Sequence, residues 1–263
     1  MKKTSLIVLL ITLLLTSCNP ARSDREEDDA DNPHINSVSE LTDDKLNLFP
    51  AALVYKLKSY NSYKSVTKGS THATGFLIDV TQSIDASVIK GEYSYYDNES
   101  HSSIVNTVHA GYYKGDKAVY ADNGGAYQKS SIEDYLKIYG TYPLDNSIEG
   151  YLIKEGVTVS RLESEQNYKF KVIFDKDKTT TNVKIQMRQF GGLDRDPTFV
   201  EDTEMIFTVK EDLTPISMEL KSHYKATKVL ETDCHQTYTV TYSNFNETIE
   251  IPKLNEVISL FSE

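Results

Sequence analysis

The chain has 263 residues, a formal net charge of −11, two cysteines, 18 tyrosines and no tryptophan. This length supplies enough material for one large or two small domains with a hydrophobic core. The acidic balance excludes nucleic acid as a partner and excludes electrostatic adhesion to anionic lipid, because both need clusters of Lys and Arg. The abundance of Tyr, Thr, Ile and Val favours strands over helices.

Residues 1–17 have the order of a secretory signal peptide. Two lysines precede the largely apolar run from Leu6 to Leu15, which is too short to span a bilayer, since spanning needs about 20 residues. The run ends in Leu15-Thr16-Ser17-Cys18, which resembles the lipobox of bacterial lipoproteins. The resemblance implies that Cys18 receives a diacylglyceryl group, and that acyl chains such as palmitate anchor the mature protein to the extracytoplasmic face of the cell membrane.

Residues 18–40 are expected to form a flexible tether behind the lipidated cysteine. The stretch from Ser23 to Asp31 is mostly Asp and Glu, and it is too poor in apolar residues to fold by itself. Fully extended, the tether reaches roughly 75 Å at about 3.4 Å per residue. Cys234 is the second of the two cysteines, so a lipidated chain has no internal disulfide and depends on packing for its stability.

Residues 41–263 are expected to form one domain, because no linker or repeat divides them. An amphipathic helix is predicted from Thr42 to Tyr60, and Pro50 either kinks it or opens its second half. Antiparallel strands follow in segments rich in Tyr, Val, Ile and Thr. These segments lie near residues 63–73, 76–90, 92–97, 103–114 and 117–128.

Short helices are predicted midway along the chain and at its end. Ser130 and Glu133 have the spacing of a capping box, and Gly140 stands where a left-handed cap would end that helix. A second short helix is predicted from Asn146, and a closing helix is predicted to open at Pro252.

Strands after Gly156 show a strict alternation of apolar and polar residues. This pattern predicts a sheet that is solvated on one face and covered on the other. The covered face is the expected lining of a ligand cavity. Its residues are Tyr168, Phe170, Val172, Phe174, Val183, Ile185, Met187, Met205, Phe207, Ile216, Met218 and Leu220.

The predicted helices are too small to cover this face. About nine strands present roughly 1,100 Å² of apolar surface at about 3.3 Å rise and 4.8 Å spacing. Helices of about 33 residues cover roughly 500 Å². The remaining face is closed by curling of the sheet, by splitting into a sandwich, or by an apolar ligand.

Two local stretches resemble uncharacterised Gram-positive members of the LolA-like lipoprotein-carrier superfamily. They are Met187 to Leu193 with Pro197-Thr198-Phe199, and Thr239 to Phe245 with Ile249 to Pro252. The resemblance implies an α+β, β-rich fold, a curved antiparallel half-barrel that stays unclosed, with an N-terminal helix, short helices midway and a C-terminal helix. It also implies that acyl chains or lipoproteins occupy the hydrophobic cavity.

No residue pattern indicates catalysis, a metal or a cofactor. The six histidines do not follow a metal-ligand spacing, and an enzyme is not expected. Cys234 and His235 are adjacent, so in a strand their side chains point to opposite faces and cannot act together, which predicts a buried, inert Cys234. Asp194-Arg195-Asp196 and Asn123-Gly124-Gly125 are interpreted as turns.

Composition and resemblance together predict an anchored, monomeric lipoprotein that binds a hydrophobic ligand, a lipid or an acyl chain, in the half-barrel. The alternative is a cell-envelope scaffold lipoprotein without a small-molecule ligand. Its partner surface would be formed by the tyrosines of the early strands. They are Tyr93, Tyr95, Tyr96, Tyr112 and Tyr113.

Overall fold

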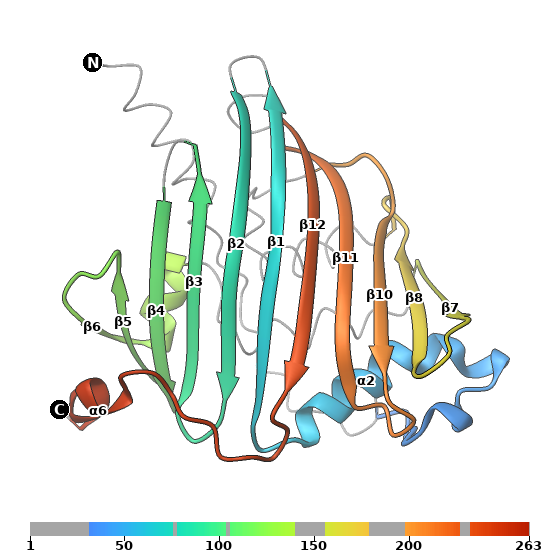
Figure 1. Ribbon diagram of the computed structural model, residues 1–263, viewed down its shortest axis with the longest axis horizontal. Coiled ribbons are helices and arrows are strands. Elements are labelled where there is room, and N and C mark those ends of the chain that lie inside the picture. Colours follow the sequence, from blue (N-terminus) through green and yellow to red (C-terminus); the bar gives the residue numbers. More distant parts are fainter. Residues whose placement is uncertain are drawn as a thin grey trace.

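A computed structural model describes residues 32–75, 78–103, 106–139, 156–178, 198–226 and 232–262. In these residues the chain forms one antiparallel sheet of 12 strands, with the order β6-β5-β4-β3-β2-β1-β12-β11-β10-β8-β7 (Figure 1). The remaining strand, β9, pairs with β11. The strands are β1 (Tyr63–Gly75), β2 (Ile78–Lys90), β3 (Ser94–Ser102), β4 (Asn106–Lys114), β5 (Lys117–Asp122), β6 (Gln128–Ser131), β7 (Val157–Leu162), β8 (Tyr168–Phe174), β9 (Thr198–Phe199), β10 (Thr203–Val209), β11 (Pro215–Ala226) and β12 (Thr232–Ser243).

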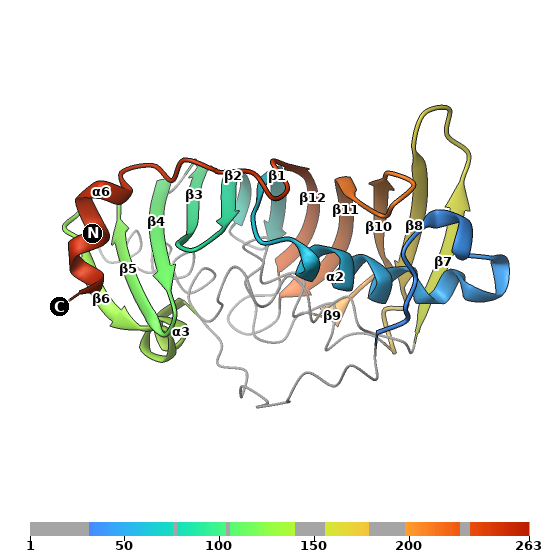
Figure 2. The same cartoon turned by 90° about the horizontal axis from the view of Figure 1, so that it is seen from below.

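Pairing between the first and last strands joins two meanders into this sheet. β1 to β6 run in chain order toward one edge, β7 to β12 run back from the other, and β12 pairs with β1 over residues 64–75. Figure 2 shows that the sheet is arched, and the described residues leave its edge strands β6 and β7 unpaired with each other. The predicted β-rich, unclosed antiparallel fold is confirmed.

The N-terminal helical region has two parts. A 3-10 segment, η3 (Asp43–Leu48), leads into α2 (Phe49–Ser59), with Pro50 in the first turn of α2. Pro50 was predicted either to kink the helix from Thr42 to Tyr60 or to open its second half, and the structure shows the second arrangement. In the first turn its missing N–H removes no helical hydrogen bond. None of the helices in the described ranges is long and apolar enough to cross a membrane.

The middle helix, α3 (Ile132–Tyr139), begins later than predicted. Its cap is Ser131, whose hydroxyl oxygen accepts a hydrogen bond from the N–H of Asp134 at 3.0 Å. The Ser130 hydroxyl instead donates to the carbonyl of Ser131. The predicted capping pair is thus displaced by one residue, because β6 continues through Ser131. The predicted Gly140 cap and the helix from Asn146 lie outside the described residues.

The C-terminal helix is shorter than predicted. Lys253 has a left-handed φ of 53°, so α6 (Leu254–Val257) starts after it rather than at Pro252, and η5 (Ile258–Phe261) continues the segment as a 3-10 helix. Val257 and Phe261 pack on the outer face of the sheet over β2 to β5. The predicted solvated face concerned the strands after Gly156, and the outer face of β2 to β5, for which no such prediction was made, is covered by this segment.

Packing of the chain starts before the predicted boundary at residue 41. Val38, in η2 (Val38–Glu40), is 1% exposed, and its N–H donates to the carbonyl of Glu211 at 2.8 Å. Val38 and Leu41 belong to the same hydrophobic cluster as the inner face of the sheet. Ile35 also packs against this cluster, so contacts with the domain begin within the proposed tether of residues 18–40.

Candidate functional site

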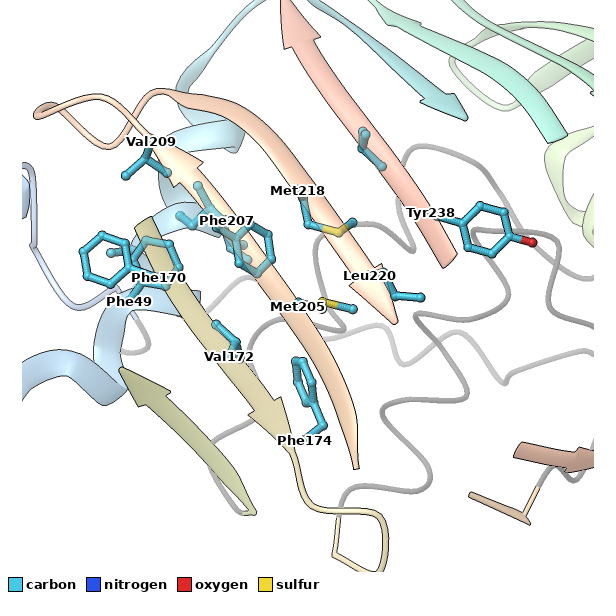
Figure 3. Packing of buried hydrophobic residues seen from close by; sticks show 14 of the residues in the cluster. Phe49, Phe170, Val172, Phe174, Met205, Phe207, Val209, Met218, Leu220 and Tyr238 are labelled. Carbon is cyan, nitrogen blue, oxygen red and sulfur yellow. The ribbon is translucent and has the colours of Figure 1, made fainter. Parts of the chain in front are cut away.

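An apolar floor lies on part of the inner face of the sheet, the face that carries α2. It is built from alternate residues of β8, β10, β11 and β12, so each side chain points the same way as its cross-strand partners. Seven predicted lining residues lie in this floor and are at most 1% exposed (Figure 3). They are Phe170, Val172, Phe174, Met205, Phe207, Met218 and Leu220.

The remaining predicted lining residues do not join this floor. Tyr168, at the start of β8, is 37% exposed, and Ile216 is half-buried beside a register shift between β10 and β11. Val183, Ile185 and Met187 lie outside the described residues.

α2 covers one end of the floor. The ring of Phe49 stacks on Phe170 with centroids 4.1 Å apart and meets Phe207 edge-on at 5.7 Å (Figure 3). Two polar contacts fasten the helix to the turn between β10 and β11. Lys56 pairs with Asp212 at 3.2 Å, and the Tyr60 hydroxyl hydrogen-bonds to Thr214 at 2.6 Å.

A polar belt crosses the inner face beyond the floor. In the sheet register Ser222, Gln236, Thr71 and Gln82 stand opposite one another on β11, β12, β1 and β2. Such a row is costly in a core unless its groups are hydrogen-bonded, and Ser222, Gln236 and Thr71 are each at most 7% exposed. Thr203 extends the belt onto β10, since its hydroxyl donates to Ser222.

One acceptor in this belt lacks a partner. The amide nitrogen of Gln236 donates to the Thr71 hydroxyl at 3.1 Å, and Thr71 also shares a 2.7 Å hydrogen bond with the Tyr238 hydroxyl. The amide oxygen of Gln236 is buried and has no hydrogen-bond partner among the described residues. Burial raises the pKa of Tyr238 to about 12, so its hydroxyl is neutral here.

Sequence reasoning missed this belt, although a signal was present. Cys234, Gln236, Tyr238 and Val240 share the inward parity of β12, and all four are at most 5% exposed. A glutamine among inward-facing apolar residues is therefore the visible mark of a buried polar site. Cys234 is buried and His235 is exposed on the opposite face, which confirms the predicted opposite orientation of the two side chains.

A hydrogen-bonded chain of Tyr135, His109 and Asp122 lies on the inner face under α3. The Tyr135 hydroxyl is 3.0 Å from Nε2 of His109, and Nδ1 of His109 is 2.7 Å from Asp122. Tyr135 is 1% exposed and its ring packs on Tyr113 and Tyr120. The chain therefore docks α3 on the sheet, a role that the sequence spacing did not indicate.

Most of the expected tyrosine surface is core. Tyr95, Tyr112 and Tyr113 are 5%, 1% and 1% exposed, because α6 and η5 cover the outer side and α3 covers the inner side.

A pocket of about 440 Å³ lies elsewhere, at the β7 to β8 hairpin from Arg161 to Tyr168, and charged and amide residues are among those that line it. Of the two predicted turns, Asn123 to Gly125 is confirmed, with Asn123 and Gly124 at positive φ, and Asp194 to Asp196 lies outside the described ranges.

No family model and no curated protein sequence matches the chain. Among solved structures it is similar to LprF from Mycobacterium bovis, with a TM-score of 0.42 and 11% identity over 80% of this chain and 96% of LprF. A LolA superfamily protein from Nitrosomonas europaea follows at 0.28 and 10%, over 78% and 96%. A DUF1329 family protein from Desulfovibrio piger gives 0.26 and 10%, over 80% and 95%.

The LolA-like resemblance predicted from the sequence thus has a LolA superfamily member among its structural neighbours. The unclosed antiparallel arrangement is given by the strand order of the chain itself. The Gram-positive type stays a prediction.

Proposed function

We propose that the chain is a membrane-anchored extracytoplasmic lipoprotein that binds an amphiphilic lipid or acyl chain on the inner face of its half-barrel. The observation that carries this proposal is the apolar floor ending in a buried polar belt whose Gln236 oxygen has no partner among the described residues. A hydrocarbon tail gains about 25 cal/mol per Å² when apolar surface is buried. A donor group at its head would satisfy the Gln236 oxygen.

The ligand class follows from this arrangement. The free energy gained by burying the tail does not depend on the head group. A buried acceptor that is left unpaired, however, costs about 1–3 kcal/mol. A ligand with a hydroxyl or amide donor therefore gains over a plain hydrocarbon of equal length. Met205 and Leu220, on the floor next to the belt in the register, would meet the tail close to its head.

Anchoring by Cys18 would keep this site near the lipid surface. About 19 residues lie between Cys18 and the docked Val38, and they reach roughly 65 Å when extended. Exchange of the ligand would then take place within that distance of the membrane. Substitution Cys18→Ser should release the protein from the membrane fraction, and membrane retention of that variant would remove the anchor from the proposal.

Binding is tested on the full chain in detergent with two probes of equal length, hexadecanol and hexadecane. The chain should bind hexadecanol more tightly, and native mass spectrometry should show co-purified lipid. Gln236→Met removes the acceptor while keeping the side-chain volume. It should weaken the binding of hexadecanol about tenfold, which corresponds to about 1.4 kcal/mol, and leave the binding of hexadecane unchanged.

Thr237→Val is the matched control, because Thr237 is the next residue on β12 and is exposed on the outer face. It should change the affinity for neither probe. Failure of the wild-type chain to bind either probe would contradict the proposal. An equal loss of affinity for both probes in Gln236→Met would contradict the assigned role of the polar belt.

A further inference from the structure

Two histidines and an aspartate meet on the outer face of β11 and β12. Nε2 of His223 is 2.7 Å from Oδ1 of Asp233, and Nε2 of His235 is 3.6 Å from Oδ2 of the same carboxylate. The two imidazole rings stack with centroids 3.9 Å apart and planes 22° from parallel. One ligand atom from each residue lies within 4.8 Å of the other two.

The hairpin register brings these residues together. His223 stands directly opposite His235 in the β11 to β12 pair, and Asp233 lies two residues before His235 on the same face. Tyr224 and Cys234 point to the inner face and are buried there. The cluster therefore consists of imidazole and carboxylate groups, and the thiol belongs to the other side of the sheet.

His223 stands between two carboxylates. Its Nδ1 is 3.5 Å from Oε1 of Glu201 and is buried, with no hydrogen-bond partner in the described part of the chain. Its Nε2 faces Asp233. A neutral imidazole carries one N–H, so one of its two nitrogens turns a lone pair toward a carboxylate. That arrangement is unfavourable for the neutral ring, and either a second ring proton or a cation between the lone pair and the oxygen relieves it.

We propose that His223, Asp233 and His235 bind a divalent transition-metal ion of the Zn²⁺ class on the outer face of the sheet. Imidazole nitrogen with carboxylate oxygen is a donor set that Zn²⁺ accepts at about 2.0–2.2 Å, whereas Ca²⁺ and Mg²⁺ prefer oxygen alone. Nδ1–H of His223 would then donate to Glu201, the outer carboxylate that commonly orients a metal-bound histidine.

Coordination would require the side chains to rearrange. Ligand atoms around a tetrahedral ion with such bonds are roughly 3.3 Å apart, whereas one ligand atom from each of the three residues lies within 4.8 Å of the others here. The His235 ring would also turn out of its stack with His223, because the lone pairs of nearly parallel rings do not meet at one ion. Asp233 and His235 are 38% and 55% exposed in their side chains, which leaves both free to move. The fourth position faces solvent and suits a water molecule.

His72 on β1 supplies the matched control. It stands opposite His235 in the register of β1 and β12, on the same outer face. Its Nδ1 is 2.9 Å from the Thr81 hydroxyl and its Nε2 is 3.7 Å from Asp79, so its ring is directed to β2 and away from the cluster. A nonspecific affinity of surface histidines would involve His72 as much as His235.

The test is calorimetric titration of ZnCl₂ into the metal-free full chain in detergent. Millimolar Mg²⁺ is kept present to occupy oxygen-only sites such as the acidic segment from Ser23 to Asp31. We expect one Zn²⁺ per chain, and His235→Gln should weaken it at least about tenfold. His72→Gln should leave the affinity unchanged, and Co²⁺ should give the visible bands of a low-symmetry site without thiolate.

Three outcomes would overturn the proposal. They are no stoichiometric Zn²⁺ binding by the wild-type chain, unchanged affinity in His235→Gln, and equal loss in His72→Gln. His235 is exposed, so its substitution does not endanger folding, and circular dichroism of each variant verifies this. The result is independent of the inner-face ligand, because hexadecanol binding is measured on the opposite side of the sheet.

Discussion

The two halves of the sheet bury their apolar residues in different ways. In the half formed by β7 to β12, the main apolar cluster lies on the inner face, where Phe170 and Phe207 pack under Phe49 of α2. In the half formed by β2 to β5, a separate cluster lies on the outer face, where Tyr112 packs under the C-terminal segment with Phe261. The inner face of this second half holds the His109 network and the tyrosines under α3.

This difference restricts where an apolar ligand can bind. An alternating strand specifies two faces but not which element covers each of them, and here the N-terminal and C-terminal helices cover opposite faces. The apolar floor therefore lies in one half of the arch, and its cluster extends into the other half only through Ile84 and Ala86 of β2 and the neighbouring Ala73 and Tyr96. The polar belt through Gln236 crosses the strands where the two halves join, β12 and β1.

Removal of the α2 cover has the largest expected effect. Phe49 is fully buried, and Phe49→Ala should lower the free energy of unfolding by about 3–5 kcal/mol, as for other buried Phe to Ala substitutions. Urea denaturation measures the change. Tyr55→Ala is the control on the same helix, since Tyr55 is only half-buried, and it should cost under about 1 kcal/mol. Equal losses would mean that the stacking on Phe170 does not hold α2.

Removal of the outer cover should cost less. Phe261 is 8% exposed, meets Tyr93 edge-on at 5.4 Å, and lies near the end of the chain, where neighbours relax more easily. Phe261→Ala should cost about 2 kcal/mol in urea denaturation. It should leave hexadecanol binding unchanged, because it acts on the opposite face. Ile258→Ala, at an exposed position, should change stability by under about 0.5 kcal/mol.

Alternation in the sequence predicted most of the inner face. The residues of β8, β10 and β11 alternate strictly, and seven of the predicted side chains lie in one buried cluster. The arrangement of covers was not predictable, because the pattern of Tyr95 and Tyr112 gives no information on whether a helix approaches from inside or outside. The capping serine was misplaced by one residue, since Ser130 and Ser131 are chemically identical.

The outer-face cluster was not predictable from spacing. His223 and His235 are far apart for a metal motif, and only the hairpin register places them opposite each other. A shift of one residue would turn one of them to the inner face. Gln236 is the opposite case, because its inward parity was visible in the sequence.

The smallest expected effect concerns the ion pair between Lys56 of α2 and Asp212. The C-terminal segment is attached instead by hydrogen bonds that its Pro252 and Phe261 carbonyls accept from Tyr112 and Lys117. Burial raises the pKa of Asp212, but hydrogen bonds from Thr214 and Lys56 outweigh it, so the net pKa lies below its usual 3.8. A carboxylate with a lowered folded-state pKa stabilises the protein above the unfolded value and loses this contribution as the pH falls through the folded value.

Asp212→Asn should therefore destabilise the chain at neutral pH by under about 1 kcal/mol, because the carboxylate is 59% exposed and solvent screens the pair. The difference from wild type should shrink below pH 3.8, as urea denaturation at a series of pH values measures. In a double-mutant cycle with Lys56→Met, the coupling should vanish over the same acidic range. A difference independent of pH would show that Asp212 acts through the Thr214 turn alone, and that the ion pair with Lys56 does not help to hold α2.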